Sequence, residues 1–136
     1  MSAARQRVLV VDDEPPIRKL LRVGLNADGY RIVEAVNARA GLERLNEAPD
    51  LIILDLGLPD MRGHDLVRAI RARNESAPIV VLSSRGDEAG KVQALDLGAD
   101  DYVTKPFGMD ELLGSNACGD AAQAADAPGT THLPGR

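Results

Sequence analysis

The chain has 136 residues, of which 44% are hydrophobic, so it is long enough for one domain with a substantial core. Its net charge of −5, with acids and bases interspersed, argues against a nucleic-acid-binding surface, and no apolar run approaches the length of a membrane span or of a signal peptide. The single cysteine, Cys118, excludes an intrachain disulfide framework, and we expect a soluble cytosolic protein.

Five apolar segments predict strands, and the segments between them have the spacing of amphipathic helices. The strands are expected over residues 8–11, 30–35, 51–54, 78–82 and 101–104. Residues at helical spacing include Ile17, Leu20, Leu21 and Leu25, then Leu42 with Leu45, then Leu66, Val67 and Ile70, and finally Val92 with Leu95. Glycines at 29 and 98 indicate helix ends. Strands that alternate with helices are typical of parallel βαβ units, so the chain is predicted to have an α/β fold.

The alternation breaks after Leu113. A fifth helix is expected to begin at residues 109–113, and it would need about three turns to cover the last strand. Residues 114–136 instead contain four glycines and two prolines, and they lack valine, isoleucine, methionine and phenylalanine. We therefore predict a domain over residues 1–113 and an atypical, largely disordered tail over residues 114–136.

Acidic residues follow two of the predicted strands directly: Asp12 and Asp13 after residues 8–11, and Asp55 after residues 51–54. An ionised carboxylate is unstable inside a strand that is buried on both faces, so these acids should lie where the strands emerge. Sheets of this kind bind ligands at the carboxyl ends of their strands. Three converging carboxylates predict a cation site. The alternative is that Asp12 or Asp13 merely caps the helix beginning at residues 15–16.

Four motifs in succession, VLVVDDE, DLIILDLGLPDMRG, IVVLSS and DDYVTKPF, resemble the receiver domain of two-component response regulators. The resemblance covers about residues 7–113. The segments DLIILDLGLPD and KPFGMDELL are most similar to the Kdp potassium-transport regulator, which belongs to the winged-helix (OmpR/PhoB-type) branch of transcription factors. The resemblance implies a flavodoxin-like, doubly wound, five-stranded parallel sheet in the order 2-1-3-4-5, with the fifth helix altered or missing.

The resemblance also implies a metal-dependent phosphoryl site at neighbouring strand ends. Asp55 would be the nucleophile that accepts a phosphoryl group from a histidine of a sensor kinase. Asp13 and Asp55, with the backbone carbonyl of Gly57, would hold Mg²⁺, and Asp12 would act largely through water. Such a protein regulates transcription and is not an enzyme, apart from its own phosphorylation and slow dephosphorylation.

Two further side chains would complete the implied site. Lys105 would supply a fixed positive charge, and Ser83 would supply a hydroxyl donor. The resemblance implies a cis peptide bond between Lys105 and Pro106. Ser83 and Tyr102 would form the switch, with the hydroxyl moving toward the phosphate and the aromatic ring turning inward. The alternative for Tyr102 is a half-buried aromatic residue with its hydroxyl in water. His64 is expected at the surface.

Regulators of this branch dimerise through the fourth helix, fifth strand and fifth helix. Charged positions that match this surface are Lys91, Asp96, Asp100, Asp101 and Glu111. Later arginines of the fifth helix, and a DNA-binding domain, have no counterpart in the sequence. We therefore expect impaired dimerisation and no direct DNA binding by this chain.

Alternatives remain open for the tail and for the function. The tail could come from a frameshift, because a reading frame shifted by one nucleotide permits a helical peptide with arginines; it could be a natural disordered tail, or residues added by cloning.

A pseudo-receiver that binds partners without phosphorylation is the non-enzymatic alternative. A haloacid-dehalogenase-type phosphatase would need Asp-x-Asp at one strand end, which the sequence does not provide.

Overall fold

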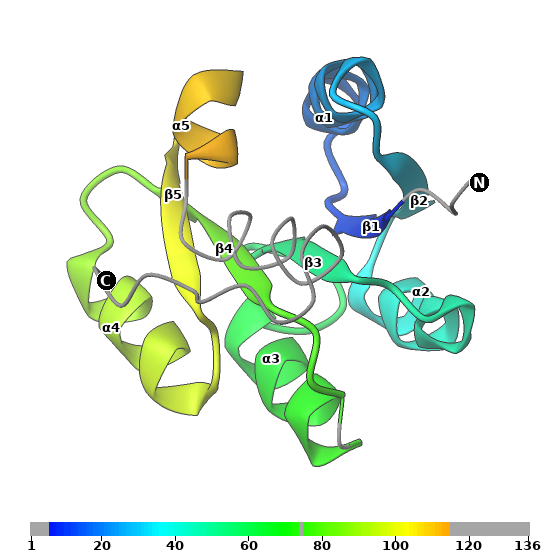
Figure 1. The fold of residues 1–136 in the computed structure, drawn as a ribbon. Helices are drawn as coiled ribbons and strands as arrows, with labels where there is room; N and C mark the ends of the chain where they lie inside the picture. Colours follow the sequence, from blue (N-terminus) through cyan, green and yellow to red (C-terminus); the bar gives the residue numbers. More distant parts are fainter. Residues whose placement is uncertain (1–5, 74, 115–136) are drawn as a thin grey trace, which may run out of the picture.

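The structure, a computed structural model, describes residues 6–73 and 75–114. Five parallel strands form one sheet in the order β2-β1-β3-β4-β5 (Figure 1). Its strands are β1 (Arg7–Val11), β2 (Arg31–Ala35), β3 (Leu51–Asp55), β4 (Ile79–Ser84) and β5 (Asp101–Lys105). The predicted fold class and strand order are confirmed, with small differences at the strand ends.

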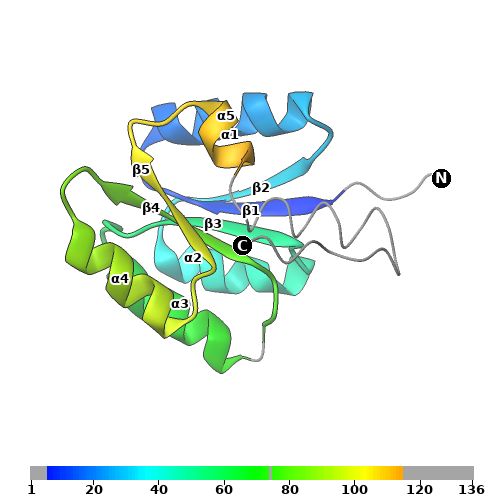
Figure 2. The ribbon, with the colours of Figure 1, turned by 60° about the vertical axis from the view of Figure 1, so that its left-hand side comes forward.

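The helices form a layer on each side of the sheet (Figure 2). One face carries α1 (Pro15–Ala27) and α5 (Met109–Leu113). The other face carries α2 (Ala38–Glu43), which continues into a short 3₁₀ helix (Arg44–Glu47), together with α3 (Gly63–Ala72) and α4 (Glu88–Leu97). None of the helices within residues 6–73 and 75–114 is both long and apolar enough to cross a membrane. The prediction for the tail concerns residues beyond the described range, apart from Gly114, and stays a prediction.

The two faces of the sheet supply two separate hydrophobic clusters, because successive side chains of a strand point to opposite faces. Val8 and Val10 of β1 pack in the cluster that contains Leu21 and Leu25 of α1. Leu9 and Val11 belong to the cluster under α2, α3 and α4. Burial of each large aliphatic side chain stabilises the fold by about 2 kcal/mol, and continuous apolar runs in the central strands follow from burial on both faces.

Glycines end two of the helices, as predicted. After α1, Gly29 adopts a φ of 95°, and after α4, Gly98 adopts a φ of 125°. Both values lie in the left-handed region, where a side chain would be strained. The chain can therefore reverse sharply and enter β2 and β5.

The loop between β3 and α3 folds back against the end of β3. The N–H of Gly63 donates to the carbonyl of Leu56 at 2.9 Å, and a Cβ atom at position 63 would overlap Leu56 and lie 2.6 Å from the carbonyl oxygen of Asp55. On its other side the loop is anchored by Asp60, which accepts the N–H groups of Ala38 and Arg39 at 2.9 and 3.0 Å. Desolvation acts to raise the pKa of Asp60, but the backbone N–H groups that donate to its carboxylate together outweigh it and lower the pKa. The loop is thus held in place beside the carboxyl end of β3.

Candidate functional site

Three acids converge at the carboxyl ends of β1 and β3. Carboxylate oxygens of Asp12, Asp13 and Asp55 lie within 4.8 Å of one another. Asp12 is fully buried and Asp55 is 8% exposed, whereas Asp13 is exposed. They meet because β1 and β3 are neighbours in the sheet and Val11 pairs with Leu54. An all-oxygen set of few carboxylates with an open side suits Mg²⁺, which keeps water and phosphate oxygens as further ligands.

Lys105 brings a positive charge to this acidic cluster from the end of β5. Its Nζ lies 3.2 Å from Oδ2 of Asp12, 3.4 Å from Oδ1 of Asp55 and 3.5 Å from Oε1 of Glu14. Burial acts to lower the pKa of Lys105, but the charges of Asp55 and Asp12 outweigh burial and raise it. The implied cis peptide bond between Lys105 and Pro106 is present. Sequence reasoning assigned no role to Glu14, although it is the third acid of VLVVDDE.

Asp12 carries an electrostatic cost in this arrangement. Burial raises its pKa, and the backbone hydrogen bond from Glu14 and the charge of Lys105 only partly compensate. Its Oδ1 accepts the N–H of Glu14 at 2.9 Å, but its Oδ2 has only the ion pair with Lys105 and no hydrogen bond of regular geometry. Glu14, not Asp12 or Asp13, occupies the N-cap position of α1, and no side-chain capping hydrogen bond is formed there, so capping does not account for Asp12 or Asp13. A water molecule bound to a cation could donate a hydrogen bond to this Oδ2 atom of Asp12.

Ser83 occupies the end of β4, next to β3. It is 1% exposed, and its Oγ has no hydrogen-bond partner among the described residues. Ser84, the neighbouring serine, is exposed. An unpaired buried hydroxyl destabilises a protein by about 1–3 kcal/mol, so native structures rarely keep one without a functional reason. The hydroxyl of Ser83 and the carboxylate of Asp12 both fit a site that receives a ligand with oxygen atoms.

A cavity of about 410 Å³ opens beside Asp55 and extends under α4. Gly57 lies at its edge, where a Cβ atom would be 3.9 Å from Oδ2 of Asp55. Arg62 and His64 also line it. The expectation of a surface position for His64 is wrong: it is 5% exposed, and its Nε2 lies 2.9 Å from the carbonyl oxygen of Gly90 in α4. The close packing at Gly63 brings the start of α3 against α4 and buries the imidazole.

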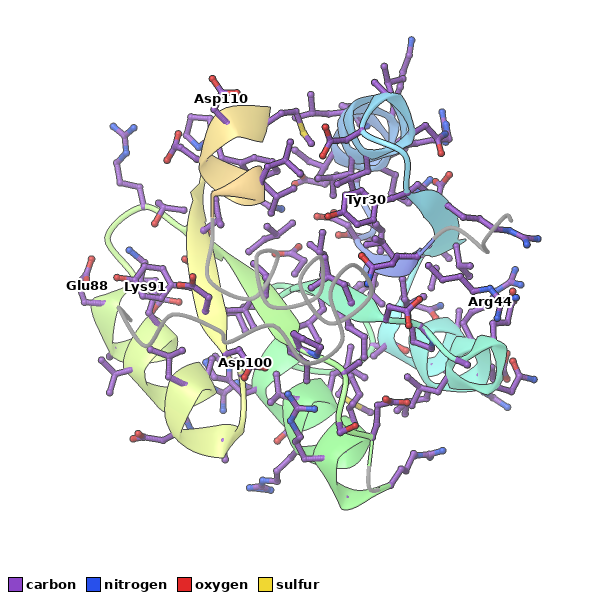
Figure 3. The ribbon with its side chains drawn as sticks, viewed as in Figure 1. Tyr30, Arg44, Glu88, Lys91, Asp100 and Asp110 are labelled. Atoms are coloured by element: carbon purple, nitrogen blue, oxygen red, sulfur yellow. The ribbon has the colours of Figure 1, made fainter. Side chains whose placement is uncertain are left out.

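Tyr102 lies near the site on β5 and contacts α4. It is 38% exposed, and the Nζ of Lys91 lies 5.0 Å from the centre of its ring. Lys91 itself is 6% exposed and forms an ion pair with Glu88 at 3.1 Å. Both side chains are labelled on α4 in Figure 3. The cation therefore covers the outward-facing ring of Tyr102, a favourable contact between a charge and an aromatic face.

The remaining candidates for a dimer surface differ in what they contact. Asp96 is exposed. Asp100 accepts hydrogen bonds from Arg71 at 2.9 Å and from the N–H of Ile79 at 2.8 Å. Asp101 accepts the N–H of Tyr102 at 2.8 Å, and Glu111 accepts the N–H of Gly108 at 3.3 Å. These intramolecular contacts give Asp100 in particular a role within the fold.

Comparison with known proteins identifies relatives over most of the chain. The family model of the response regulator receiver domain matches residues 8–115. The transcriptional regulatory protein KdpE of Mycobacterium tuberculosis (strain CDC 1551 / Oshkosh) is 54% identical over 107 residues, which cover 78% of this chain and 47% of that protein. The KDP operon transcriptional regulatory protein KdpE of Escherichia coli (strain K12) is 51% identical over 106 residues, 77% of this chain and 47% of that protein.

A solved structure supports the fold independently. The receiver domain of the Francisella response regulator 1452 matches with a TM-score of 0.80 and 28% identity, covering 89% of this chain and 99% of that one. The chain spans about half the length of the KdpE proteins that it matches. The resemblance to the Kdp-type regulators that the sequence motifs indicated is confirmed.

Proposed function

The chain belongs to the family of response regulator receiver domains, and from this premise we propose that it accepts a phosphoryl group on Asp55 from a histidine of a sensor kinase. The proposed domain comprises residues 1–113. Its relatives are named as transcriptional regulators, and we propose that phosphorylation of this chain likewise controls transcription. We assign it no turnover of a separate substrate beyond its own phosphorylation and slow dephosphorylation.

The proposal rests on two polar groups at the strand ends around Asp55: the ammonium group of Lys105, and the hydroxyl of Ser83, which has no hydrogen-bond partner among the described residues. Lys105 lies within 3.4 Å of the Asp55 carboxylate, and the hydroxyl of Ser83 is buried. A phosphoryl group is transferred by positioning and by neutralisation of the charge on its oxygens. Lys105 would bind one such oxygen by charge, and Ser83 would donate a hydrogen bond to another.

Asp13 and Asp55, with the carbonyl of Gly57, are the proposed ligands of Mg²⁺, and Asp12 would complete the metal site largely through bound water. When bound, the ion would neutralise negative charge shared by these acids and the incoming phosphoryl group. Asp55 then attacks phosphorus with a carboxylate oxygen while the bond to the leaving group breaks. Lys105 holds the transferred group in line, and the surrounding buried side chains limit access of water to the product.

Transmission of the signal is proposed to use Ser83 and Tyr102. On phosphorylation the hydroxyl of Ser83 would move to the phosphate, and the ring of Tyr102 would turn inward and leave its contact with Lys91. This would change the surface of α4, β5 and α5, through which we propose that a homodimer forms, with its formation impaired by the altered C-terminus. Lys91 can join that surface only after its contact with Tyr102 opens, because it is now buried.

Phosphorylation of the purified chain tests the central proposal. Incubation with acetyl phosphate and Mg²⁺ should add one phosphoryl group by intact-mass spectrometry, and Asp55→Asn should abolish the addition. A suitable control is Asp65→Asn, which removes a carboxylate that is 50% exposed on α3. No mass change in the unmutated chain would favour a pseudo-receiver, and a mass change that survives Asp55→Asn would exclude Asp55 as the acceptor.

A further inference from the structure

The cavity beside Asp55 has a charged group that the proposed phosphoryl chemistry does not use. The cavity lies between the loop after β3 and the first turns of α4. Of the described residues that line it, Arg62 is the one with a fixed positive charge. No carboxylate within residues 6–73 and 75–114 forms an ion pair with this guanidinium, whereas most other arginines with contacts have one. Arg62 therefore offers an uncompensated cation to the cavity.

His64 and Gln93 hold Arg62 in this position. The Nη2 atom of Arg62 lies 3.2 Å from Nδ1 of His64 and 3.3 Å from Oε1 of Gln93. Since a guanidinium only donates hydrogen bonds, Nδ1 of His64 must accept, and the ring proton belongs on Nε2. Nε2 faces the carbonyl oxygen of Gly90 at 2.9 Å, which requires the same proton. The two contacts thus agree on one neutral tautomer and make His64 a positioning residue for Arg62.

The two acidic residues that line the cavity, Asp87 and Asp55, do not neutralise Arg62. Asp87 lines the cavity, but its Oδ1 accepts the N–H of Gly90 at 3.0 Å and caps α4. Asp55 lies within 3.4 Å of Lys105 and belongs to the proposed metal cluster. Both carboxylates therefore have partners of their own. The charge of Arg62 remains available to an anion that enters the cavity.

We propose that this cavity receives the leaving group of the phosphodonor, and that Arg62, positioned by His64, favours donors whose leaving group departs as an anion. The inference rests on the proposed phosphorylation of Asp55. In phosphoryl transfer the attacking and leaving atoms lie roughly in line with phosphorus, so the leaving group departs on the side away from Asp55, into the space that this residue faces. Arg62 is a specificity-determining residue of that space.

Two small phosphodonors with different leaving groups can distinguish stabilisation of an anionic leaving group by Arg62 from a general contribution of Arg62 to donor binding. With acetyl phosphate, the bond between phosphorus and the acyl oxygen breaks as the Asp55–phosphorus bond forms, and the electron pair leaves on acetate. Negative charge thus develops at the leaving oxygen, where a guanidinium stabilises it. With phosphoramidate, the nitrogen is already protonated and leaves as neutral ammonia. A cation gives that reaction no comparable stabilisation.

The test compares initial rates of phosphorylation by the two donors in the full chain with Mg²⁺. We expect Arg62→Gln to lower the rate with acetyl phosphate about fivefold relative to the rate with phosphoramidate, a size that suits the contact of one exposed charge. His64→Leu removes the acceptor that orients Arg62 and should lower the same ratio by a smaller factor. Arg62→Lys keeps the charge but loses the planar donor and should fall between wild type and Arg62→Gln.

Two controls keep the proposal falsifiable. Arg68→Gln removes the same charge from an arginine of α3 that is 64% exposed, and it should leave the donor ratio unchanged. Beryllofluoride has no leaving group, so Arg62→Gln should bind it as the unmutated chain does. Equal slowing with both donors, an unchanged ratio, or the same change in Arg68→Gln would overturn the role of Arg62. Failure of both donors with the unmutated chain would instead contradict the proposed phosphorylation.

Discussion

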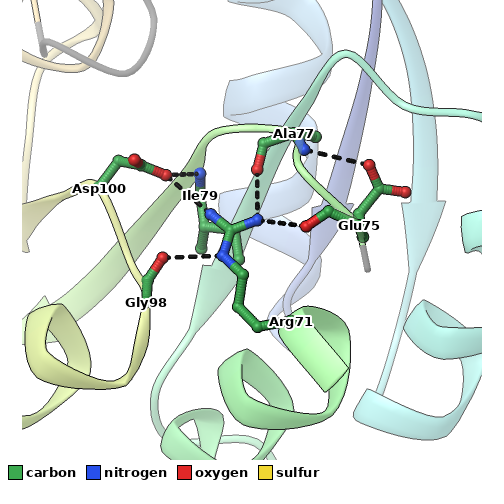
Figure 4. A network of polar contacts seen from close by, with 6 residues as sticks. All are labelled: Arg71, Glu75, Ala77, Ile79, Gly98 and Asp100. Carbon is green, nitrogen blue, oxygen red and sulfur yellow. Dashed lines mark hydrogen bonds and ion pairs between the residues drawn. The ribbon is translucent and has the colours of Figure 1, made fainter. Parts of the chain in front are cut away.

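Charged side chains are compensated at one end of the sheet and only partly compensated at the other. At the end where β4 and β5 begin, Arg71 donates to the carbonyls of Gly98, Glu75 and Ala77 at 3.0, 2.7 and 2.9 Å, and to Asp100 at 2.9 Å (Figure 4). At the end where the strands finish, Lys105 faces three carboxylates, and two buried polar atoms have no hydrogen bond within the described residues.

The difference separates a structural cluster from a functional one. Every contact of Arg71 joins segments that the fold must hold together: the end of α3, the turn after α4 and the start of β4. Around Asp55, by contrast, acids repel one another and the hydroxyl of Ser83 is unpaired. Groups that lower the stability of the ligand-free protein indicate a site that is complementary to a ligand.

The largest expected effect on stability comes from Arg71→Met. It should lower the free energy of unfolding by about 3 kcal/mol, because several backbone carbonyls and Asp100 lose their donor at once. Urea denaturation followed by circular dichroism measures the change, with Arg68→Met as a control on the exposed face of α3. Phosphorylation by acetyl phosphate should persist under conditions where the variant is folded. A stability close to that of the control would show that the cluster does not stabilise the fold.

Asp12→Asn should raise the free energy of unfolding, and by less than Arg71→Met lowers it. Removing a buried charge that is only partly compensated should stabilise the metal-free protein by about 1 kcal/mol, while Mg²⁺ should bind more weakly. Denaturation with EDTA and with Mg²⁺ separates the two effects. If the variant is less stable than the unmutated chain in EDTA, the charge of Asp12 supports the fold instead of straining it.

The raised pKa of Asp12 predicts how the difference in stability between Asp12→Asn and the unmutated chain depends on pH. The folded state holds the proton of Asp12 more tightly than the unfolded state, in which the carboxyl has a pKa near its ordinary value of 3.8. The contribution of Asp12 to stability is therefore neutral below that value, and it becomes unfavourable as the pH rises through the raised pKa of the folded state. The stability advantage of Asp12→Asn in EDTA should accordingly appear on raising the pH and vanish in acid.

Ser83→Ala should give the smallest change in stability. Loss of an unpaired buried hydroxyl should leave the free energy of unfolding unchanged or raise it by up to about 1 kcal/mol, whereas beryllofluoride should bind more weakly. Ser84→Ala, at an exposed neighbouring position, should change neither quantity. Destabilisation by Ser83→Ala together with normal beryllofluoride binding would place the hydroxyl in the fold and outside the phosphoryl site.

The charged residues at the strand ends were identifiable from sequence because strand order converts chain position into spatial position. Asp12, Asp13 and Asp55 follow apolar runs directly, and parallel pairing of β1 with β3 brings them together. The contacts of Lys91 and His64 were not identifiable in this way. Both lie on helices, and their burial depends on how α3, α4 and β5 pack, which the local pattern does not specify.

By itself, the sequence determined the α/β fold, the strand order through its family motifs, and the acids that crowd one end of the sheet. These depend on periodicity and on the position of a residue within its own strand, which are local properties of the chain. The tertiary structure decided which polar groups find partners. Arg71 is satisfied and Ser83 is not, because distances of a few ångströms between separate segments fix whether a buried charge or hydroxyl is compensated.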